Sequence, residues 1–389
     1  MMQLPPLSLY IHLPWCVKKC PYCDFNSHEG RQPVPFGEYI DALITDLEQD
    51  LPLVWGRPLV SIFIGGGTPS LFSATDIGRL LQAVSSRLIV RPDAEITLEA
   101  NPGAIEHDEF EAYHAAGVNR VSLGVQSFDD GCLGRIGRIH GSREVHQALD
   151  SLTRSGLERY NLDLMYGLPG QTVQQAREDI EQALSWQPRH VSHYQLTLEP
   201  NTAFGHAPPD LPDEPSIDVM QSDCSELLRS AGMSQYEVSA WAVQGSECQH
   251  NNNYWRFGDY LGIGAGAHGK LTDLHQQRVV RTAKHRHPKR YLESIASGRF
   301  TQSRRELGPD DLVFEFFLNQ LRLRRPLQKA EFEARTGLPW SATAEPVQSA
   351  CERGFLVDQP DSIETTPQGW DFLNDLQAIF LPEKGLETP

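Results

Sequence analysis

The sequence predicts an α/β fold, in which a partial, TIM-like (β/α)6 barrel is followed by a C-terminal α+β extension with a winged-helix-like unit. Three observations support this prediction. From residue 8 to about residue 200, short β-branched runs alternate with helical stretches, as in a parallel sheet covered by helices. Six runs are predicted as strands, fewer than the eight that close a full barrel. Beyond residue 305 the pattern becomes mainly helical.

Each predicted barrel strand is a short run rich in Val, Ile, Leu or Tyr. The six strands are expected at residues 9–13, 60–64, 95–98, 120–125, 160–165 and 191–198. Helices are expected between them at 36–50, 74–88, 106–116, 129–154 and 172–186. Ser73 and Thr172 are suitable N-caps for the second and the fifth of these helices. In such barrels the functional loops follow the carboxyl ends of the strands.

The rest of the chain is predicted to form two further units. A Pro- and Asp-rich linker at 200–214 sets the expected domains at 1–205 for the barrel, 206–305 for a barrel-covering α+β extension and 306–389 for the winged-helix-like domain. The extension is expected to contain a helix at 215–231, a strand at 235–241, a polar block at 248–270, a strand pair at 270–282 and a helix from 288.

The last unit is predicted as three helices and a two-stranded wing, followed by a final helix. These elements are expected at 310–322, 327–336, 344–353, 354–365 and 367–380. A DNA-binding winged helix would have a basic third helix, whereas this one contains Glu345 and Glu352. We therefore expect it to pack within the protein or contact a partner.

Charge and hydropathy exclude several classes of function. The net charge of −17 argues against sequence-independent binding of nucleic acid and against a polybasic membrane anchor. No run approaches the roughly 18 apolar residues of a transmembrane segment, and no signal peptide is expected at the N-terminus. The seven cysteines form no disulfide-like framework, so a reducing cytoplasm is the expected compartment.

Three cysteines lie on the loop that follows the first predicted strand. Cys16, Cys20 and Cys23 have the spacing C-x3-C-x2-C. Iron–sulfur clusters normally take four thiolates, so three would leave one iron of a [4Fe-4S] cluster open to a small ligand. A zinc site or three ordinary core cysteines are the alternatives, but structural zinc takes a fourth ligand and usually paired C-x2-C units. The spacing is typical of the radical S-adenosylmethionine (SAM) superfamily, and the chain resembles a member.

Other chemistry-bearing residues follow the carboxyl ends of the later strands. A glycine triplet at 65–67 allows backbone groups to approach an amino-acid head group, although it would also suit a plain tight turn. Glu99 and Asp163 suit the ribose diol and the ammonium of SAM, and Arg138 suits its carboxylate. Each of these side chains could instead be a solvated loop residue or a buried cap.

Longer motifs extend the resemblance to the whole chain. Residues 64–69, 99–103, 124–128, 137–140, 161–165 and 167–169 resemble the branch that contains oxygen-independent coproporphyrinogen III oxidase. The blocks 248–255 (CQHNNNYW) and 258–268 (GDYLGIGAGAH) resemble the HemW family of heme chaperones. This resemblance implies a partial barrel, a [4Fe-4S] cluster with exchangeable SAM, and heme. By motif, it assigns cofactor contacts to Tyr10, Tyr22, Gly66, Gly67, Thr68, Glu99, Gln126, Arg138 and Asp163, and by loop pattern alone to Thr197 and His268.

One departure separates the two families. The oxidase motif has a further cysteine two residues after the third, where this chain has Phe25, and no arm precedes the cysteines here. Both differences favour a heme chaperone that hands heme to acceptor proteins such as membrane-bound respiratory enzymes. Such a chain is expected in the cytoplasm, either free or held at the inner face of the membrane by a partner. A porphyrinogen-decarboxylating radical SAM enzyme is the alternative.

The polar block contains the side chains that could bind heme. Heme iron takes an axial His, Cys, Met or Tyr, and the block offers Cys248, His250 and Tyr254. His250 is predicted as a heme ligand or as a neighbour of the attachment point. The other interpretation is that His250 and Asn251 only form hydrogen bonds at the barrel mouth.

Overall fold

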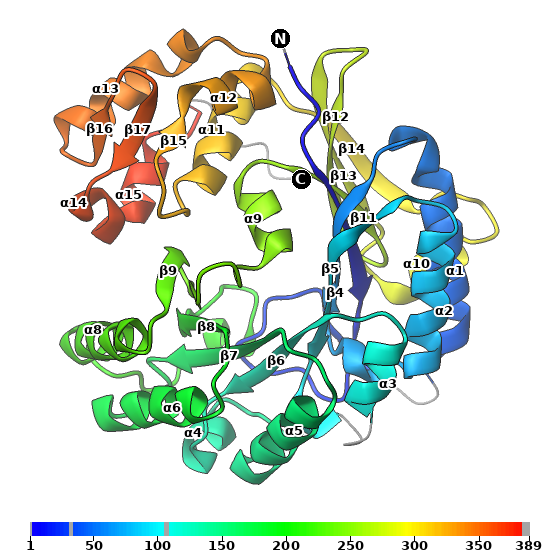
Figure 1. Cartoon of the computed structure of the whole chain (residues 1–389), viewed down its shortest axis with the longest axis vertical. Helices are drawn as coiled ribbons and strands as arrows, with labels where there is room; N and C mark the ends of the chain where they lie inside the picture. The colour runs from blue at the N-terminus through cyan, green and yellow to red at the C-terminus, as the bar shows by residue number, and fades with distance from the viewer. Residues whose placement is uncertain (1, 31–33, 105–108, 383–389) are drawn as a thin grey trace.

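A twelve-stranded sheet forms the centre of the molecule, and the six predicted strands lie side by side within it (Figure 1). The computed structural model describes residues 2–30, 34–104 and 109–382. Its strand order is β14-β13-β12-β11-β1-β4-β5-β6-β7-β8-β10-β9. The six strands are β1 (Leu7–Leu13), β4 (Leu59–Gly66), β5 (Val90–Ala100), β6 (Arg120–Gln126), β7 (Tyr160–Tyr166) and β8 (His190–Gln195), all parallel. Since β14 and β9 are the two end strands of this order and do not pair with each other, the barrel is open, as predicted.

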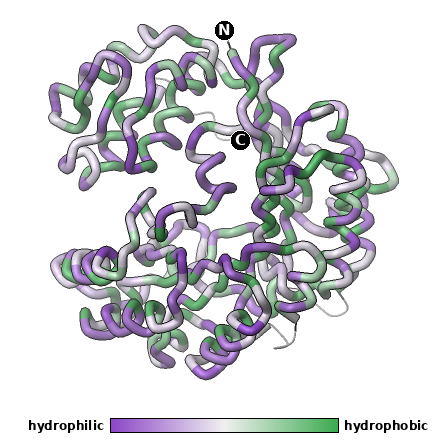
Figure 2. Tube along the Cα trace, in the orientation of Figure 1, coloured by the Kyte–Doolittle hydropathy of each residue, from purple (hydrophilic) through white to green (hydrophobic). Residues whose placement is uncertain are grey.

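Helices cover the outer face of the parallel strands. They are α1 (Phe36–Asp50), α2 (Ala74–Ser85), α3 (Glu109–Ala115), α5 (Ser142–Arg154) and α6 (Val173–Ser185). The predicted N-caps are confirmed, because the hydroxyls of Ser73 and Thr172 accept hydrogen bonds from the third residue of α2 and α6. The predicted start of the third helix lies outside the described residues. Figure 2 shows hydrophobic residues concentrated along the central strands.

The single helix predicted over 129–154 is wrong. The chain forms α4 (Asp130–Arg135) and α5, with a loop between them. Gly137 has φ of 72° in this loop, and an added Cβ would lie 2.8 Å from Cδ of Pro21. A helix cannot continue through this left-handed residue, and the resulting turn places the next residue, Arg138, beside the cysteine loop.

Residues 206–305 extend the sheet at both of its edges. β9 (Ser234–Glu237) and β10 (Ala240–Ala242) lie beyond β8, so the predicted strand at 235–241 is a hairpin. β11 (Asp259–Ile263) pairs in parallel with β1, and β12 (His268–Asp273), β13 (Arg278–Lys284) and β14 (Thr301–Glu306) follow it as antiparallel strands. Three helices belong to this part, α8 (Glu214–Ser230), α9 (Gln249–Trp255) and α10 (Pro288–Glu293). The predicted linker also contains a short helix, α7 (Ala203–His206).

The C-terminal unit has the predicted winged-helix-like arrangement and a hydrophobic core of its own. Its helices are α11 (Pro309–Gln320), α12 (Lys329–Thr336) and α13 (Ala344–Glu352). Its small sheet has the order β15 (Leu327–Gln328), β17 (Ser362–Thr365), β16 (Leu356–Asp358). Phe316, Phe317 and Phe332 are fully buried in its core. The predicted final helix is two helices, α14 (Pro367–Asp371) and α15 (Leu373–Ala378).

No helix among the described residues has both the length and the apolar character needed to cross a membrane.

Candidate functional site

The three cysteines lie on a loop that is tied to the end of β1. The strand β2 (Trp15–Cys16) pairs with β3 (His28–Glu29), so the loop starts and ends at one point. Inside it, the backbone N–H of Cys23 donates to the carbonyl of Cys20 at 3.1 Å, and Nζ of Lys19 donates to the carbonyl of Phe25 at 3.0 Å. The ring of Trp15 packs edge-on against Tyr39 with centroids 4.7 Å apart. These contacts hold the loop without a helix or a disulfide.

The three thiols are free and half-buried. Burial raises the pKa of Cys16 and of Cys23, and each of these two thiols feels the charge of Cys20. Within the described ranges, no three His, Cys, Asp or Glu side chains are arranged to hold a single metal ion. A four-iron cluster requires a different arrangement of ligands, because each thiolate binds a different iron atom of the cluster. Three thiols spaced along one loop can provide this arrangement.

The glycine triplet packs directly against the cysteine loop. Gly66 has φ of 121°, and an added Cβ would lie 2.6 Å from the ring of His12. An added Cβ at Gly67 would lie 2.5 Å from the carbonyl oxygen of Trp15. The N–H of Thr68 donates to that same oxygen at 2.8 Å. Glycine is therefore needed here for the approach of two protein segments, and the same lack of side chains leaves backbone accessible to a ligand.

Three polar side chains, those of Arg138, Asn101 and Thr68, connect the ends of β4, β5 and β6 to the cysteine loop. The guanidinium of Arg138 donates to Oδ1 of Asn101 at 2.6 Å, to the carbonyl of Gly124 at 2.5 Å and to Sγ of Cys20 at 3.7 Å. Nδ2 of Asn101 donates to Oγ1 of Thr68 at 3.0 Å. A pocket lies beside this network and is lined by Cys20, Thr68, Asn101 and Arg138, among other residues. Nε of Arg138 is buried without a hydrogen-bond partner among the described residues, so a polar ligand could satisfy it.

Glu99 lies beside the glycine triplet as a buried carboxyl. Its Oε2 accepts a hydrogen bond from the N–H of Gly66 at 3.0 Å. Burial raises the pKa of Glu99 to about 7, and the nearby Asp163 adds to the increase. When a ligand's ammonium group binds beside such a carboxyl, its positive charge favours the ionised carboxylate.

Asp163 and Gln126 lie further along the same end of the barrel. Asp163 accepts hydrogen bonds from Ser122 at 3.0 Å and from Asn161 at 2.7 Å. Gln126 has a left-handed φ of 71°, and its Oε1 accepts from the hydroxyl of Tyr194 at 2.8 Å. A non-glycine residue with this φ is rare and is typical of functional sites.

Tyr10 and His12 form a hydrogen-bonded pair below the glycine triplet. Burial lowers the pKa of His12 to about 4, so the ring is neutral. Its Nε2 donates to the carbonyl of Asn26 at 2.9 Å, which leaves Nδ1 to accept from the Tyr10 hydroxyl at 2.9 Å. His12 is a lesser heme candidate from the sequence and is not among the cofactor contacts assigned by motif, although it lies near the end of the first predicted strand.

The remaining predicted contacts differ in position. Tyr22 is half-buried, and the charges of both Arg138 and Cys20 affect its pKa, which burial raises. Thr197 is exposed beyond the end of β8 and donates to Glu199 at 3.0 Å. His268 is exposed at the start of β12, close enough to His12 for its charge to lower the pKa of that ring. Thr197 and His268 therefore lie at the rim of the site.

The polar block forms α9, which lies between the barrel and the C-terminal unit (Figure 1). One face of this helix is anchored. Nδ1 of His250 lies 3.1 Å from the hydroxyl of Ser61, which lies 2.7 Å from that of Ser8, and Nδ2 of Asn253 donates to Ser8 at 2.8 Å. The ring of His250 is buried, with its centroid 4.9 Å from that of Phe63. The other side chains of the block, Asn251, Asn252, Tyr254 and Trp255, are only partly buried.

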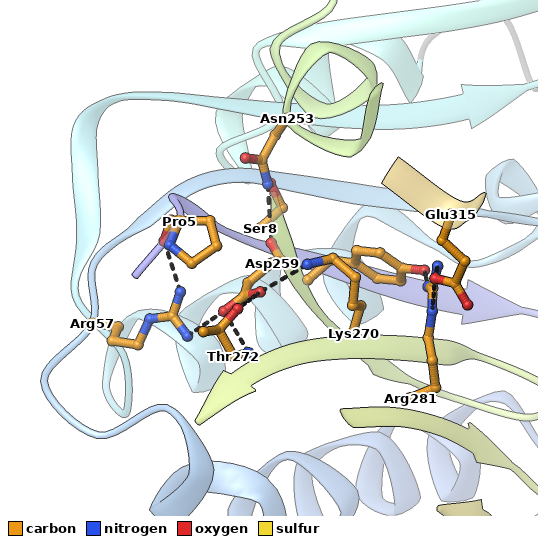
Figure 3. Close-up of polar contacts among 10 residues, drawn as sticks. Pro5, Ser8, Arg57, Asn253, Asp259, Lys270, Thr272, Arg281 and Glu315 are labelled. Carbon is orange, nitrogen blue, oxygen red and sulfur yellow. Dashed lines mark hydrogen bonds and ion pairs between the residues drawn. The ribbon is translucent and has the colours of Figure 1, made fainter. Parts of the chain in front are cut away.

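A buried charge cluster, centred on Asp259, supports α9 from below (Figure 3). Asp259 is fully buried and forms ion pairs with Arg57 at 2.8 Å and Lys270 at 3.1 Å. Its carboxylate also accepts from the N–H and the hydroxyl of Thr272, both at 2.9 Å. The backbone carbonyl of Asp259 accepts from Nδ2 of Asn253 in α9. This cluster joins β11, β12 and α9 at the end of the barrel opposite the cysteine loop.

The fold and this arrangement of loops define a radical SAM protein. A family model described as the radical SAM superfamily matches residues 10–183, and one described as the HemN C-terminal domain matches residues 307–372. The chain is 49% identical over 383 residues to the heme chaperone HemW of Escherichia coli (strain K12), covering 98% of this chain and 100% of that protein. It is 47% identical over 388 residues to the heme chaperone HemW of Haemophilus influenzae, covering 99% of this chain and 100% of that protein. The chain belongs to the HemW family.

A solved structure confirms the fold over the whole chain. The coproporphyrinogen III oxidase HemN from Escherichia coli superimposes with a TM-score of 0.83 at 23% identity, covering 97% of this chain and 90% of that one. At that identity the match supports the architecture alone. Membership of the radical SAM superfamily implies a [4Fe-4S] cluster and SAM.

Proposed function

We propose that this chain is a heme chaperone, which binds heme together with a SAM-liganded [4Fe-4S] cluster and transfers the heme to acceptor proteins. The observation that carries the proposal is α9, a helix held in the barrel by one face while its opposite side chains stay partly exposed. Relatives that the chain matches over their whole length are named heme chaperones. Acceptors would include membrane-bound respiratory enzymes, which the chain would meet at the inner face of the membrane.

The cluster is proposed to bind Cys16, Cys20 and Cys23, with SAM at the remaining iron. When bound, such a cluster can supply one electron to its ligand. This chain's own contribution is positioning, because Arg138 donates to the sulfur of Cys20, to the loop after β5 and to the backbone of β6.

SAM is proposed to occupy the space along the carboxyl ends of the strands. Glu99 would accept from its ammonium group, Asp163 would accept from its ribose, and Arg138 would bind its carboxylate. The other proposed contacts are Tyr10, Tyr22, Gly66, Gly67, Thr68 and Gln126 near these side chains, with Thr197 and His268 at the rim.

For heme, the burial of His250 favours one of its two predicted roles. The residue is 8% exposed and its ring packs against Phe63, which leaves little access for heme iron, and the hydrogen bond between Nδ1 and Ser61 ties the ring to β4. We therefore propose that His250 is a neighbour that anchors α9, and that the partly exposed side chains of the helix face heme. On this account His250→Ala should weaken heme binding and leave the Soret maximum in place. A shifted Soret maximum with heme still bound would instead identify His250 as the axial ligand.

The alternative is a porphyrinogen-decarboxylating radical SAM enzyme. The shared fold is compatible with it, but Phe25, which stands where the oxidase motif has a cysteine, is 60% exposed. To separate the two, reconstituted protein is incubated anaerobically with reductant, SAM and coproporphyrinogen III, and protoporphyrinogen is followed. We expect no protoporphyrinogen to form, and we expect the same protein to bind heme tightly at a ratio of 1:1. Turnover would contradict a function limited to chaperoning.

A further inference from the structure

An unusual group of arginines surrounds the C-terminal end of α9. Arg256 follows the helix, Arg322 and Arg325 lie in the turn after α11, and Arg335 lies near the end of α12. The guanidinium of Arg322 lies 4.3 Å above the ring of Trp255. We call these four arginines and Trp255 the arginine cluster. They bring together three segments that are distant in the sequence.

Several donors in the arginine cluster are buried and unused. Nε of Arg322, Arg325 and Arg335 and Nε1 of Trp255 have no hydrogen-bond partner among the described residues. The side chain of Arg335 has no hydrogen bond and no ion pair with the described part of the chain. Buried N–H groups are normally paired, so four unpaired donors in one region indicate a missing acceptor.

The charges around these donors are also unbalanced. Glu331 pairs with Arg325 at 2.8 Å and with Arg256 at 3.3 Å, and Glu237 pairs with Arg322 at 3.4 Å. Four guanidinium groups thus face two carboxylates. Burial lowers the pKa of Arg335, the charges of Glu331 and Asp259 raise it, and those of Arg256 and Arg325 lower it further. This imbalance is unusual in a chain with a net charge of −17 and favours an anionic ligand.

We propose that the arginine cluster is an anion site that binds the carboxylates of a porphyrin lying against α9. The proposal rests on the proposed function, and it identifies heme propionates as the groups that dock there. Guanidinium groups bind carboxylates through two parallel hydrogen bonds, and the unused Nε atoms are part of that geometry. Trp255, which belongs to the arginine cluster, is also one of the partly exposed side chains that are proposed to face heme.

The test compares hemin with hemin dimethyl ester, in which both carboxylates are esterified. The full-length, reconstituted protein is titrated with each ligand by absorbance. The original chain should bind hemin about tenfold or more tightly than the ester, since a hydrogen bond to a charged group is worth this much or more. Arg335→Ala and Arg325→Ala should bind hemin about tenfold more weakly and should bind the ester as before. Trp255→Phe, which keeps an aromatic side chain but replaces the indole and removes its N–H, should reduce the preference for hemin in the same way.

Matched controls separate this site from a fold defect. Arg304→Ala removes an exposed arginine from β14 and should leave both affinities unchanged. Unchanged ester binding in the cluster variants shows that the porphyrin face is intact. Equal affinity of the original chain for hemin and its ester, or equal loss of both ligands in the variants, would overturn the inference. If the original chain binds neither porphyrin, the proposed function itself fails.

Discussion

The guanidinium of Arg138 donates a hydrogen bond to the sulfur of Cys20 across 3.7 Å. The two residues are 118 positions apart, and the turn at Gly137 between α4 and α5 brings them together. The same guanidinium also contacts Asn101 in the loop after β5 and the carbonyl of Gly124 in β6. One side chain therefore connects the cysteine loop to the strand ends at which SAM is proposed to bind.

Replacing any one of the three loop cysteines should abolish the cluster. Cys16→Ser, Cys20→Ser and Cys23→Ser each remove one of only three protein ligands, so we expect iron to fall from about four per chain to near zero. Iron quantitation and visible absorbance of anaerobically purified protein would measure this. Cys351→Ser changes a partly buried cysteine in the C-terminal unit and should retain full iron. Unchanged cluster spectra in all three loop variants would refute the assignment.

Arg138→Gln should make the cluster harder to reduce. Its positive charge and its hydrogen bond to the sulfur stabilise the more negative, reduced cluster. A loss of about 1.4 kcal/mol corresponds to about 59 mV for one electron, so we expect a potential lower by roughly this amount. A redox titration followed by electron paramagnetic resonance would measure it. An unchanged potential would contradict this prediction and would show that Arg138 only holds the neighbouring chain segments in place.

Glu99 should make stability depend on pH between about 4.5 and about 7. Its pKa is raised by burial, so the folded protein keeps a proton that the unfolded chain releases in this range. Its contribution to stability is therefore complete below about pH 4.5 and is lost as the pH rises to about 7. The loss is about 3 kcal/mol at most.

Unfolding by urea at pH 5 and pH 8 would test this prediction in protein without SAM. Glu99→Gln should remove that part of the pH dependence, whereas Glu178→Gln, on an exposed part of α6, should keep it. The same pH dependence in Glu99→Gln as in the original chain would contradict the prediction.

Asp259→Asn should destabilise the fold by about 3–5 kcal/mol. The change leaves Lys270 and Arg57 without their common partner, and a buried charge without a partner is costly. Asp93→Asn is the matched control, because Asp93 pairs with Arg91 at the exposed start of β5 and its removal should change stability little. Chemical unfolding would measure both, and equal effects would rule out the proposed role of the charge cluster.

Local patterns predicted the parallel core of the fold correctly. Alternating strands and helices were visible because each element buries its own apolar face. The pairing of β11 with β1 could not be predicted, because it joins segments about 250 residues apart and depends on no local sequence pattern. β14 was missed because all six of its residues are exposed, so it shows no alternation of apolar and polar residues.

The motifs predicted which residues belong to the candidate site, but they did not predict the hydrogen bonds and contacts that connect these residues. The cysteines, the glycine triplet and Arg138 were marked by type and spacing. The bridging role of Asn101 between Arg138 and Thr68 and the position of His12 below Gly66 depend on how separate loops meet. The burial of His250 depends in the same way on Ser61 and Phe63, which lie far away in the sequence.

Heme transfer is the measurement that tests the central claim most directly. Protein loaded with one heme per chain is mixed with the apo-form of a respiratory heme protein or, separately, with apomyoglobin as a passive scavenger, and heme arrival is followed by absorbance. For a heme chaperone, we expect transfer to the respiratory acceptor to be faster than release to the scavenger and to become faster as the acceptor concentration rises. Transfer at the scavenger rate, independent of acceptor concentration, would contradict a chaperone function.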